Sequence, residues 1–289
     1  MAVENKPPKQ LYMRDIQTMK DRGEKIVLAA PWDYNSTRLA EEAGADVVVV
    51  GGATVAMMMG GRPHALGTSM DEMLSLTRLV APAVRRAVLY VSLPYGSFHV
   101  SNKQAVKNAI QLVKAGAHCI KAQTPGALIK RARAIINAGI TFVGHVGLLP
   151  HTIYKRGGFR VYGKTCVEAI ELYEECRELE RIGASAIEME CVPAKVAAEI
   201  STRVRIPIFG IGSGPGTDGQ FQVTIDVLGF QKSLAIKYAK RYVDMWAIAM
   251  EAYKRAVDEV RTGLFPDESH TFAIPDQEFV KFMEHVHAK

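Results

Sequence analysis

The chain has 289 residues, of which 48% are hydrophobic and 23% are charged, a composition typical of a globular protein with a sizeable core. The formal charge of +6 is dispersed along the chain rather than gathered in one basic tract, which argues against a nucleic-acid partner and favours small anionic ligands. The four cysteines form no C-x-x-C pair, so neither a zinc site nor a redox dithiol is indicated. The apolar stretch at 47–61 is too short and too rich in glycine to span a membrane. The absence of a secretory signal predicts a cytoplasmic protein.

Short runs rich in β-branched residues alternate along the chain with segments of helical period. This alternation is typical of βα units that build a parallel sheet. We predict eight strands, at residues 26–30, 46–50, 87–93, 117–121, 141–145, 186–191, 206–211 and 225–228. Glycines that end a helix recur just before several of these strands, at Gly44, Gly116, Gly139 and Gly183.

The eight repeated units predict an α/β fold, and specifically a (β/α)8 TIM barrel, which commonly uses about 250 residues as one domain. We expect a flexible N-terminus at 1–11, the barrel at 12–264, and a tail at 265–289 that packs on the barrel or on a neighbouring subunit. A doubly wound open sheet is the alternative, but no G-x-G-x-x-G follows the first strand to support a dinucleotide site.

In such a barrel the active site forms where strands run into their following loops, so polar residues there are informative. The predicted strand ends offer a set of candidate binding residues, namely Tyr34, Gly52, Ser92, Lys121, Gln123, His145, Glu190 and Ser213. Two loops are further candidates for the site. The basic segment 147–164 predicts either a mobile lid or a solvated loop. The glycine-rich loop 210–219 is a weak signal for anion binding.

Glu188 and Glu190 share one face of their strand, because side chains alternate along it. If that face is the barrel interior, burial and mutual repulsion raise the proton affinity of one carboxylate. Such a group suits a general base that removes a proton beside a carbonyl, and we predict this role for Glu190. The alternative is that Glu188 pairs with a lysine while Glu190 is a loop carboxylate.

Lys121 ends a buried strand, so its ammonium must be paired, neutral or available to an anion. We favour an electrostatic clamp for a carboxylate or oxyanion; a Schiff-base nucleophile and a salt bridge to Glu188 are the alternatives. His145 is placed to donate a hydrogen bond to a substrate oxygen or to relay a proton. Cys191 is expected to be a small buried residue rather than a nucleophile.

Several motifs also carry a family resemblance, in family order between residues 12 and 272. They are Trp32-Asp33-Tyr34, the stretches 144–150 and 157–163, Glu190-Cys191-Val192-Pro193, the loop 210–214 with 217–220, and 265–270. Together they resemble the ketopantoate hydroxymethyltransferase (3-methyl-2-oxobutanoate hydroxymethyltransferase) family. The resemblance implies a barrel of the phosphoenolpyruvate mutase and isocitrate lyase type.

The resemblance implies a reaction and roles for three residues. Family members bind magnesium, which holds 3-methyl-2-oxobutanoate while a base removes its C3 proton, and the enolate attacks the one-carbon unit of 5,10-methylenetetrahydrofolate. Glu190 matches the base, His145 a histidine near the substrate, and Lys121 the lysine near the substrate carboxylate. The resemblance also implies a large homo-oligomer, such as a decamer.

The departures from the family pattern fall on the expected metal ligands. Where the family has Val-Gly-Asp-Ser, Asp-Leu-Pro and Lys-x-Glu, this chain has Val50-Gly51-Gly52-Ala53, Ser92-Leu93-Pro94 and Lys121-Ala122-Gln123. Magnesium prefers carboxylate oxygens, so the uncharged Gly52, Ser92 and Gln123 predict that it binds poorly. Ala53 also removes a hydroxyl that family members use, and we place Gly52, Ala53, Ser92, Gln123, Glu188, Tyr34 and Ser213 at the substrate.

Three hypotheses follow. The leading one is a metal-independent hydroxymethyltransferase or aldolase-type lyase that forms an enolate of a 2-oxo acid or a related carbonyl compound with Glu190 as base. The second is ordinary magnesium-dependent ketopantoate synthesis, with main-chain oxygens and waters replacing the lost ligands. The third is a non-catalytic scaffold that keeps the family's assembly.

Overall fold

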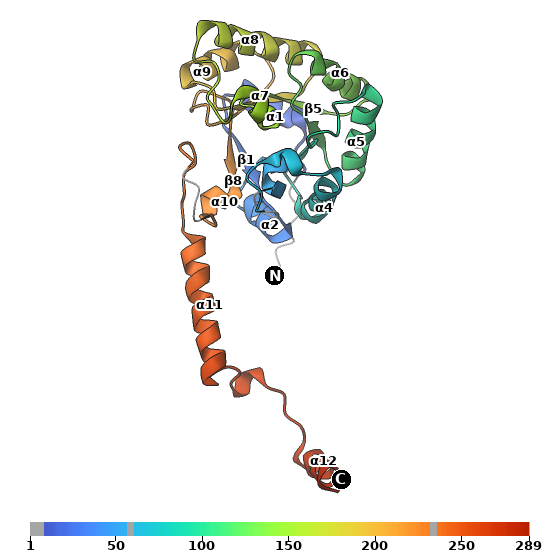
Figure 1. The fold of residues 1–289 in the computed structure, drawn as a ribbon, viewed down its shortest axis with the longest axis vertical. Helices are drawn as coiled ribbons and strands as arrows, with labels where there is room; N and C mark the ends of the chain where they lie inside the picture. Colours follow the sequence, from blue (N-terminus) through green and yellow to red (C-terminus); the bar gives the residue numbers. More distant parts are fainter. Residues whose placement is uncertain (1–8, 57–60, 232–235, 289) are drawn as a thin grey trace.

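A computed structural model describes residues 9–56, 61–231 and 236–288. Eight parallel strands form a closed barrel in sequence order, with β8 pairing back to β1 (Figure 1). The strands are β1 Ile26–Ala30, β2 Val47–Val50, β3 Val88–Ser92, β4 Cys119–Lys121, β5 Phe142–Gly147, β6 Ala186–Glu190, β7 Ile208–Ile211 and β8 Gly219–Val223. The predicted TIM barrel is confirmed.

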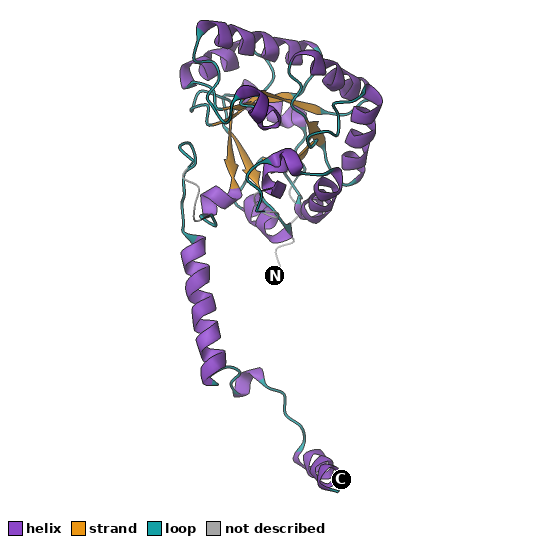
Figure 2. Cartoon of the chain, in the orientation of Figure 1, coloured by secondary structure: helices purple, strands orange, loops and turns teal. Residues whose placement is uncertain are grey.

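The described helices surround the barrel except for the last two, which extend away from it, as the colouring by secondary structure shows (Figure 2). They are α1 Met13–Asp21, α2 Tyr34–Glu42, α3 Gly52–Thr54, α4 Met70–Val80, α5 Asn102–Lys114, α6 Ile129–Asn137, α7 Ile153–Arg156, α8 Cys166–Arg181, α9 Ala194–Arg203, α10 Thr224–Leu228, α11 Met245–Thr262 and α12 Asp276–His287. Short 3-10 turns lie at 65–67, 81–83, 126–128, 150–152 and 268–270.

The predicted eighth strand was wrong. Residues 225–228 belong to helix α10, and β8 is the preceding segment Gly219–Val223. The sequence of β8, Gly-Gln-Phe-Gln-Val, carries little of the β-branched pattern on which the prediction depended. Gly219 is needed where β8 meets β1, since a Cβ there would come within 3.0 Å of the carbonyl oxygen of Ile26.

The core has two layers that follow from the alternation of side chains along each strand. The barrel interior is filled by residues such as Leu28, Val49 and Phe209, and Ile16 of α1 belongs to the same cluster. A larger cluster lies between the strands and the surrounding helices. Polar residues that continue the inward face of a strand toward its carboxyl end must therefore meet inside the barrel.

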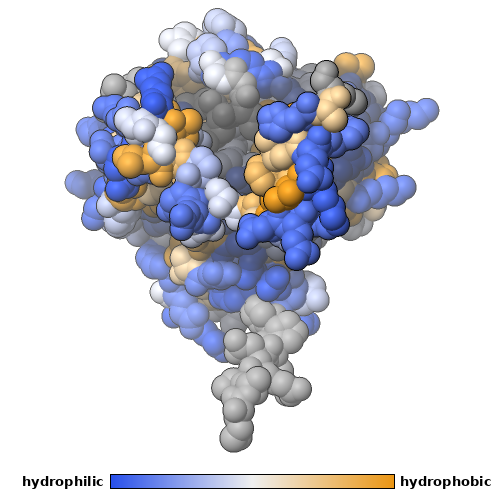
Figure 3. Space-filling model, turned by 90° about the horizontal axis from the view of Figure 1, so that it is seen from below, coloured by the Kyte–Doolittle hydropathy of each residue, from blue (hydrophilic) through white to orange (hydrophobic). Residues whose placement is uncertain are grey.

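The C-terminal segment forms an arm, defined here as residues 245–288, that projects from the barrel (Figure 1). Every residue from 251 to 282 is exposed. We expected α11 inside the barrel domain at 12–264, but it leaves the barrel, and the described tail does not pack on it. In the view along the arm, hydrophobic patches interrupt a largely hydrophilic surface (Figure 3). Among the described residues, no helix combines the length and apolar character needed to cross a membrane.

Candidate active site

Four adjacent strands, β3 to β6, direct polar side chains into the barrel. Lys121 lies two residues after Cys119, and His145 two residues after Val143, both of which belong to the interior cluster. Glu188 and Glu190 follow Ala186 on β6 in the same way. The register pairs His145 with Glu188 and Gly147 with Glu190. The predicted catalytic residues Lys121, His145 and Glu190 are therefore brought together.

These side chains form one continuous network. The ammonium of Lys121 donates to Oε1 of Glu188 at 2.8 Å and lies 3.3 Å from Nδ1 of His145. Nδ1 of His145 is 3.4 Å from the same carboxylate oxygen. On the other side of the ring, Nε2 lies 3.1 Å from Oε2 of Glu190, a close contact without hydrogen-bond geometry. The imidazole thus connects the two carboxylates.

Tyr90 completes the network, and the sequence reasoning missed it. Its hydroxyl donates a hydrogen bond to Oε2 of Glu188. Its ring is fully buried and stacks on Phe209 across the barrel, with ring centroids 6.5 Å apart. A buried tyrosine needs a partner for its hydroxyl, and this rule, applied to the tyrosine in the run Val88–Ser92, is the signal that could have found it.

The charge state of Glu188 differs from the expectation. Burial alone would raise its pKa, but the Lys121 ammonium, His145 and the Tyr90 hydroxyl outweigh burial and lower the pKa below its ordinary value. Burial and the Glu188 carboxylate raise the pKa of Tyr90 well above its ordinary value, so the phenol remains a donor. The repulsion expected between Glu188 and Glu190 is therefore offset at Glu188, which is held as an anion.

This depressed pKa predicts how stability depends on pH. The unfolded chain binds a proton at Glu188 more readily than the folded protein, so the stabilisation is complete above the ordinary value of 4.5 and is lost as the pH falls through the lower folded value. We expect the difference in unfolding free energy between wild type and Glu188→Gln to shrink in acid. Urea titrations at a series of pH values measure it, and a difference that stays constant would contradict the assignment.

Glu190 is positioned by constraints on the backbone around it. Gly147 has φ +85°, and a Cβ there would come within 2.2 Å of the carbonyl oxygen of Glu190. Cys191 adopts φ +52°, a conformation that a residue with a side chain rarely adopts. Its N–H donates to Ile211 and its carbonyl accepts from Tyr162. Burial and the Glu190 carboxylate raise the pKa of the Cys191 thiol to about 12, and the side chain, which we expected to be buried, is half-buried.

The three positions expected to be metal ligands offer one free oxygen. Gly52 has no side chain. Oε1 of Gln123 accepts from the backbone N–H of His151 at 2.9 Å. Oγ of Ser92 is buried and has no hydrogen-bond partner within the described residues, and it lies beside Lys121 in the strand register. A hydroxyl, an engaged amide and a missing side chain do not match the carboxylate set that magnesium prefers.

A second group to consider as metal ligands consists of His145, Glu188 and Glu190. Each residue offers one ligand atom, and these atoms lie within 4.8 Å of one another. A cation among them would meet the Lys121 ammonium, which already binds Glu188. Like charges at this separation repel strongly when buried. The Lys121 ammonium already supplies a positive charge to this group through its contacts with Glu188 and His145.

The remaining predicted substrate residues lie outside the network. Ser213 is fully buried, and its hydroxyl donates to the carbonyl of Met189 and accepts from the N–H of Val192, so it supports the backbone around Glu190. Tyr34 and Ala53 are exposed, Tyr34 as the first residue of α2 and Ala53 within α3.

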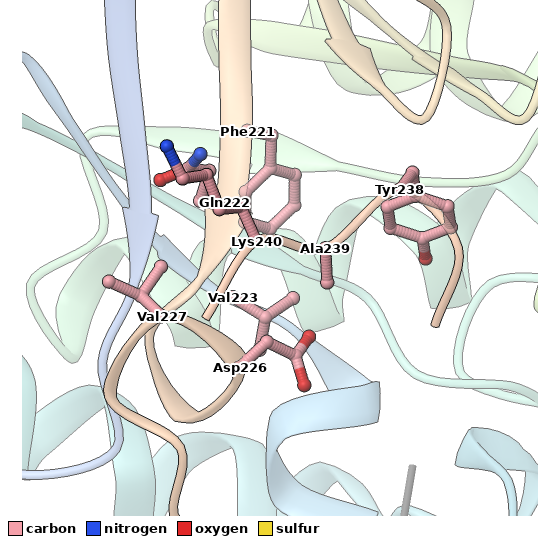
Figure 4. A pocket seen from close by; sticks show the side chains of 8 residues that line it. All are labelled: Phe221, Gln222, Val223, Asp226, Val227, Tyr238, Ala239 and Lys240. Carbon is pink, nitrogen blue, oxygen red and sulfur yellow. The ribbon is translucent and has the colours of Figure 1, made fainter. Parts of the chain in front are cut away.

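The glycine-rich loop 210–219 serves packing. A Cβ on Gly214 or Gly216 would come within 2.4 Å of Ala194 or Ala198 on α9. Gly212, with φ +64°, leaves room for the ring of Tyr238. Tyr238 lines a pocket at the end of β8 with Phe221, Gln222, Val223, Asp226, Val227, Ala239 and Lys240 (Figure 4). The pocket and the network share no residue.

The segment 147–164 is basic and partly helical. Within it α7 ends at Gly157, which has the left-handed conformation of a helix cap. The guanidinium groups of Arg156 and Arg160 lie over the ring of Tyr162, at 4.3 and 4.0 Å from its centroid. Arg156 also donates to the carbonyl of Gly147. These contacts attach the segment to the end of β5, and its role as a lid stays a prediction.

Known proteins share both the sequence and the barrel. The family model for ketopantoate hydroxymethyltransferase matches residues 10–268. A 3-methyl-2-oxobutanoate hydroxymethyltransferase of Nitratidesulfovibrio vulgaris is 36% identical over 274 residues, covering 94% of this chain and 89% of that protein.

Solved structures agree on the fold. The structure of 2,3-dimethylmalate lyase, a PEP mutase/isocitrate lyase superfamily member, has a TM-score of 0.57 at 13% identity and covers 90% of this chain and 91% of its own. Phosphonopyruvate hydrolase, solved with oxalate and magnesium, has a TM-score of 0.55 at 14% identity and covers 96% of both chains. The barrel is similar in fold to those of PEP mutase/isocitrate lyase superfamily members, and the chain belongs to the ketopantoate hydroxymethyltransferase family.

Proposed function

We propose that this protein is a carbon–carbon bond enzyme that removes a proton beside the carbonyl of a 2-oxo acid or a related carbonyl compound, with Glu190 as the base. The observation that carries the proposal is the network from Tyr90 to Glu190. Glu190 is its more accessible carboxylate, with 12% of its side chain exposed against 2% for Glu188. One carboxylate is fixed inside the barrel, and the other faces the mouth, where a substrate enters.

The other groups of the network suit the charge that develops during this step. Proton removal drives electrons toward the carbonyl, and a cation preorganised in a buried site stabilises that charge better than water does. Lys121 is the cation within reach, and the free hydroxyl of Ser92 beside it is a donor for the substrate carboxylate. His145 is in contact with both carboxylates and is placed to move a proton between groups.

We further propose that this step does not depend on magnesium. The support is the donor set: Gly52, Ser92 and Gln123 offer no carboxylate, and the ammonium of Lys121 contacts both Glu188 and His145. The name of the bacterial relative makes 3-methyl-2-oxobutanoate the first acid to test. The family resemblance makes 5,10-methylenetetrahydrofolate the first one-carbon donor.

The test separates proton removal from bond formation. Deuterium incorporation from heavy water into 3-methyl-2-oxobutanoate and a panel of other carbonyl acids is followed by NMR, and each acid that exchanges is then offered 5,10-methylenetetrahydrofolate. We expect exchange in at least one acid, followed by a hydroxymethylated product. No exchange in any member of the panel would exclude the proposal and favour a scaffold role.

The arm supports a second proposal, that the protein is a homo-oligomer in which the arm of one chain covers a neighbouring chain. On α11, the apolar residues Trp246, Met250, Tyr253, Val257 and Val260 recur at helical spacing and are all exposed. An exposed apolar stripe of this kind typically marks an interface. In the barrel of the same chain, the helix that directly follows β8 is α10, which has five residues.

Charges placed on this stripe should dissociate the assembly. We expect Tyr253→Glu with Val257→Glu to sediment as a smaller species than wild type, because burying two carboxylates in an apolar interface is unfavourable. Arg255→Glu, a change of charge on the same helix outside the stripe, is the control. Sedimentation velocity measures the result, and identical profiles for all three proteins would exclude the stripe as an interface.

A further inference from the structure

One tautomer of His145 gives the network a consistent set of proton positions. The ammonium of Lys121 has three donors and no acceptor, so at 3.3 Å from Nδ1 of His145 it donates to that nitrogen. A neutral imidazole that accepts at Nδ1 carries its proton on Nε2, and Nε2 faces Oε2 of Glu190 at 3.1 Å. In this tautomer Lys121 donates to His145, and the Nε2 proton faces Glu190 in a close contact without hydrogen-bond geometry.

A proton moves along the line from Lys121 through His145 to Glu190 once the Glu190 carboxylate turns to accept from Nε2, because their 3.1 Å contact does not yet have hydrogen-bond geometry. If Lys121 gives a proton to Nδ1 while Nε2 gives its own to Glu190, the ring changes tautomer, Lys121 becomes a neutral amine, and Glu190 becomes a carboxylic acid. A neutral amine beside an acid is the pair of groups that converts a carbonyl into an imine. The same line thus delivers a nucleophile and a proton donor to the mouth of the barrel.

We propose that Lys121 forms a Schiff base with the carbonyl carbon of the 2-oxo acid, and that His145 relays the proton that frees its amine. This inference rests on the proposed function, because the Schiff base serves the same proton removal. It accounts for the uncharged Gly52, Ser92 and Gln123, since an iminium nitrogen bonded to the substrate supplies the electron sink.

The steps balance. The Lys121 nitrogen forms a bond to the carbonyl carbon, and the π electrons of the C=O bond move to oxygen, which takes the proton from Glu190. His145 then gives its Nδ1 proton to the hydroxyl and takes one from the Lys121 nitrogen in its place, the C–O bond breaks, water leaves, and the C=N bond forms. Overall, an ammonium and a ketone give an iminium and water. Glu190, again a carboxylate, removes the adjacent C–H proton, and the electrons move to nitrogen to give an enamine.

Glu188 and Tyr90 are positioning residues in this scheme. The Glu188 carboxylate lies 2.8 Å from the reacting nitrogen, so it is the counter-ion first of the ammonium and then of the iminium. Tyr90 holds that carboxylate through its second oxygen. The hydroxyl of Ser92, buried and unbonded within the described residues, lies beside Lys121 as a donor for the substrate carboxylate.

Borohydride reduction tests the inference on the wild-type protein. The protein is incubated with 3-methyl-2-oxobutanoate or pyruvate, reduced with sodium borohydride, and measured by intact mass spectrometry and peptide mapping. We expect a mass increase equal to the acid minus one oxygen atom, located on Lys121. Lys121→Arg, which keeps the charge but forms no Schiff base, should lose both the adduct and α-proton exchange, whereas Lys114→Arg, on an exposed lysine, should keep both.

The outcomes separate this inference from the proposed function. Exchange without a reducible adduct, or exchange that persists in Lys121→Arg, would overturn the Schiff base and leave the enolate chemistry standing. An adduct on another lysine would also overturn it. Neither exchange nor adduct with any carbonyl acid would overturn both. Because the adduct is mapped on the wild-type protein, the result does not depend on whether a variant folds.

Discussion

Replacing Glu190 by glutamine is expected to reduce α-proton exchange by about a hundred- to ten-thousandfold, the range that general-base catalysis contributes. The amide keeps the shape of the side chain but has no basic oxygen to take the proton. The rate of deuterium incorporation into the best acid of the panel, followed by NMR, measures the effect.

Glu171→Gln is the matched control, because Glu171 is an exposed glutamate on α8. Its exchange rate should equal that of wild type. Exchange in Glu190→Gln within a factor of about two of wild type would remove Glu190 from the role of base, since even weak general-base catalysis exceeds that factor.

Replacing Glu188 by leucine is expected to lower the free energy of unfolding by about 3–5 kcal/mol, the typical loss when one partner of a buried ion pair is removed. The change leaves the Lys121 ammonium, only 10% exposed, without its carboxylate and removes the acceptor of the Tyr90 hydroxyl. Equilibrium unfolding in urea measures the loss, provided that the oligomeric state of both proteins is matched.

The double variant Lys121→Met with Glu188→Leu is the control for this prediction. It removes both charges together, so it should recover most of the lost stability, because a buried ion pair replaced by apolar residues of similar volume costs little. A loss below about 1 kcal/mol in Glu188→Leu, the value of a solvent-exposed pair, would show that the pair is not buried in solution.

Much of the fold follows from the sequence because hydrophobic alternation is a strong signal for buried parallel strands. The first seven predicted strands agree with β1 to β7 within two residues at either end. The eighth failed because β8 holds two glutamines and a glycine, while the more apolar run after it is the helix α10. The barrel closes through backbone pairing between β8 and β1, and a periodicity argument does not detect that pairing.

The candidate site was predicted where position along a strand determines contact. Lys121, His145 and Glu190 meet because each continues the inward face of its strand. Tyr90 was missed because a tyrosine in an apolar run reads as core, and only the position of Glu188 on another strand gives its hydroxyl a partner. The sequence does not show that the backbone near β6 engages the hydroxyl of Ser213, and the place of this residue at the substrate stays a prediction.

The arm was the least predictable part of the chain. The periodicity of α11 correctly indicates an amphipathic helix. The pattern does not show which surface packs against the apolar face of that helix. A helix that covers its own barrel and one that covers a neighbouring chain carry the same pattern. The expected boundary at residue 264 therefore placed α11 with the barrel, whereas the helix begins to project at residue 245.

The most direct test of the central claim is α-proton exchange by enzyme stripped of metal. Wild-type protein is treated with chelator, its residual metal content is measured, and exchange into the best acid is compared in chelator and in saturating magnesium. Exchange at the same rate in both is the result that the Lys121, His145 and Glu190 network predicts. Exchange that vanishes in chelator and returns with magnesium would contradict it and would restore the magnesium-dependent reaction of the family.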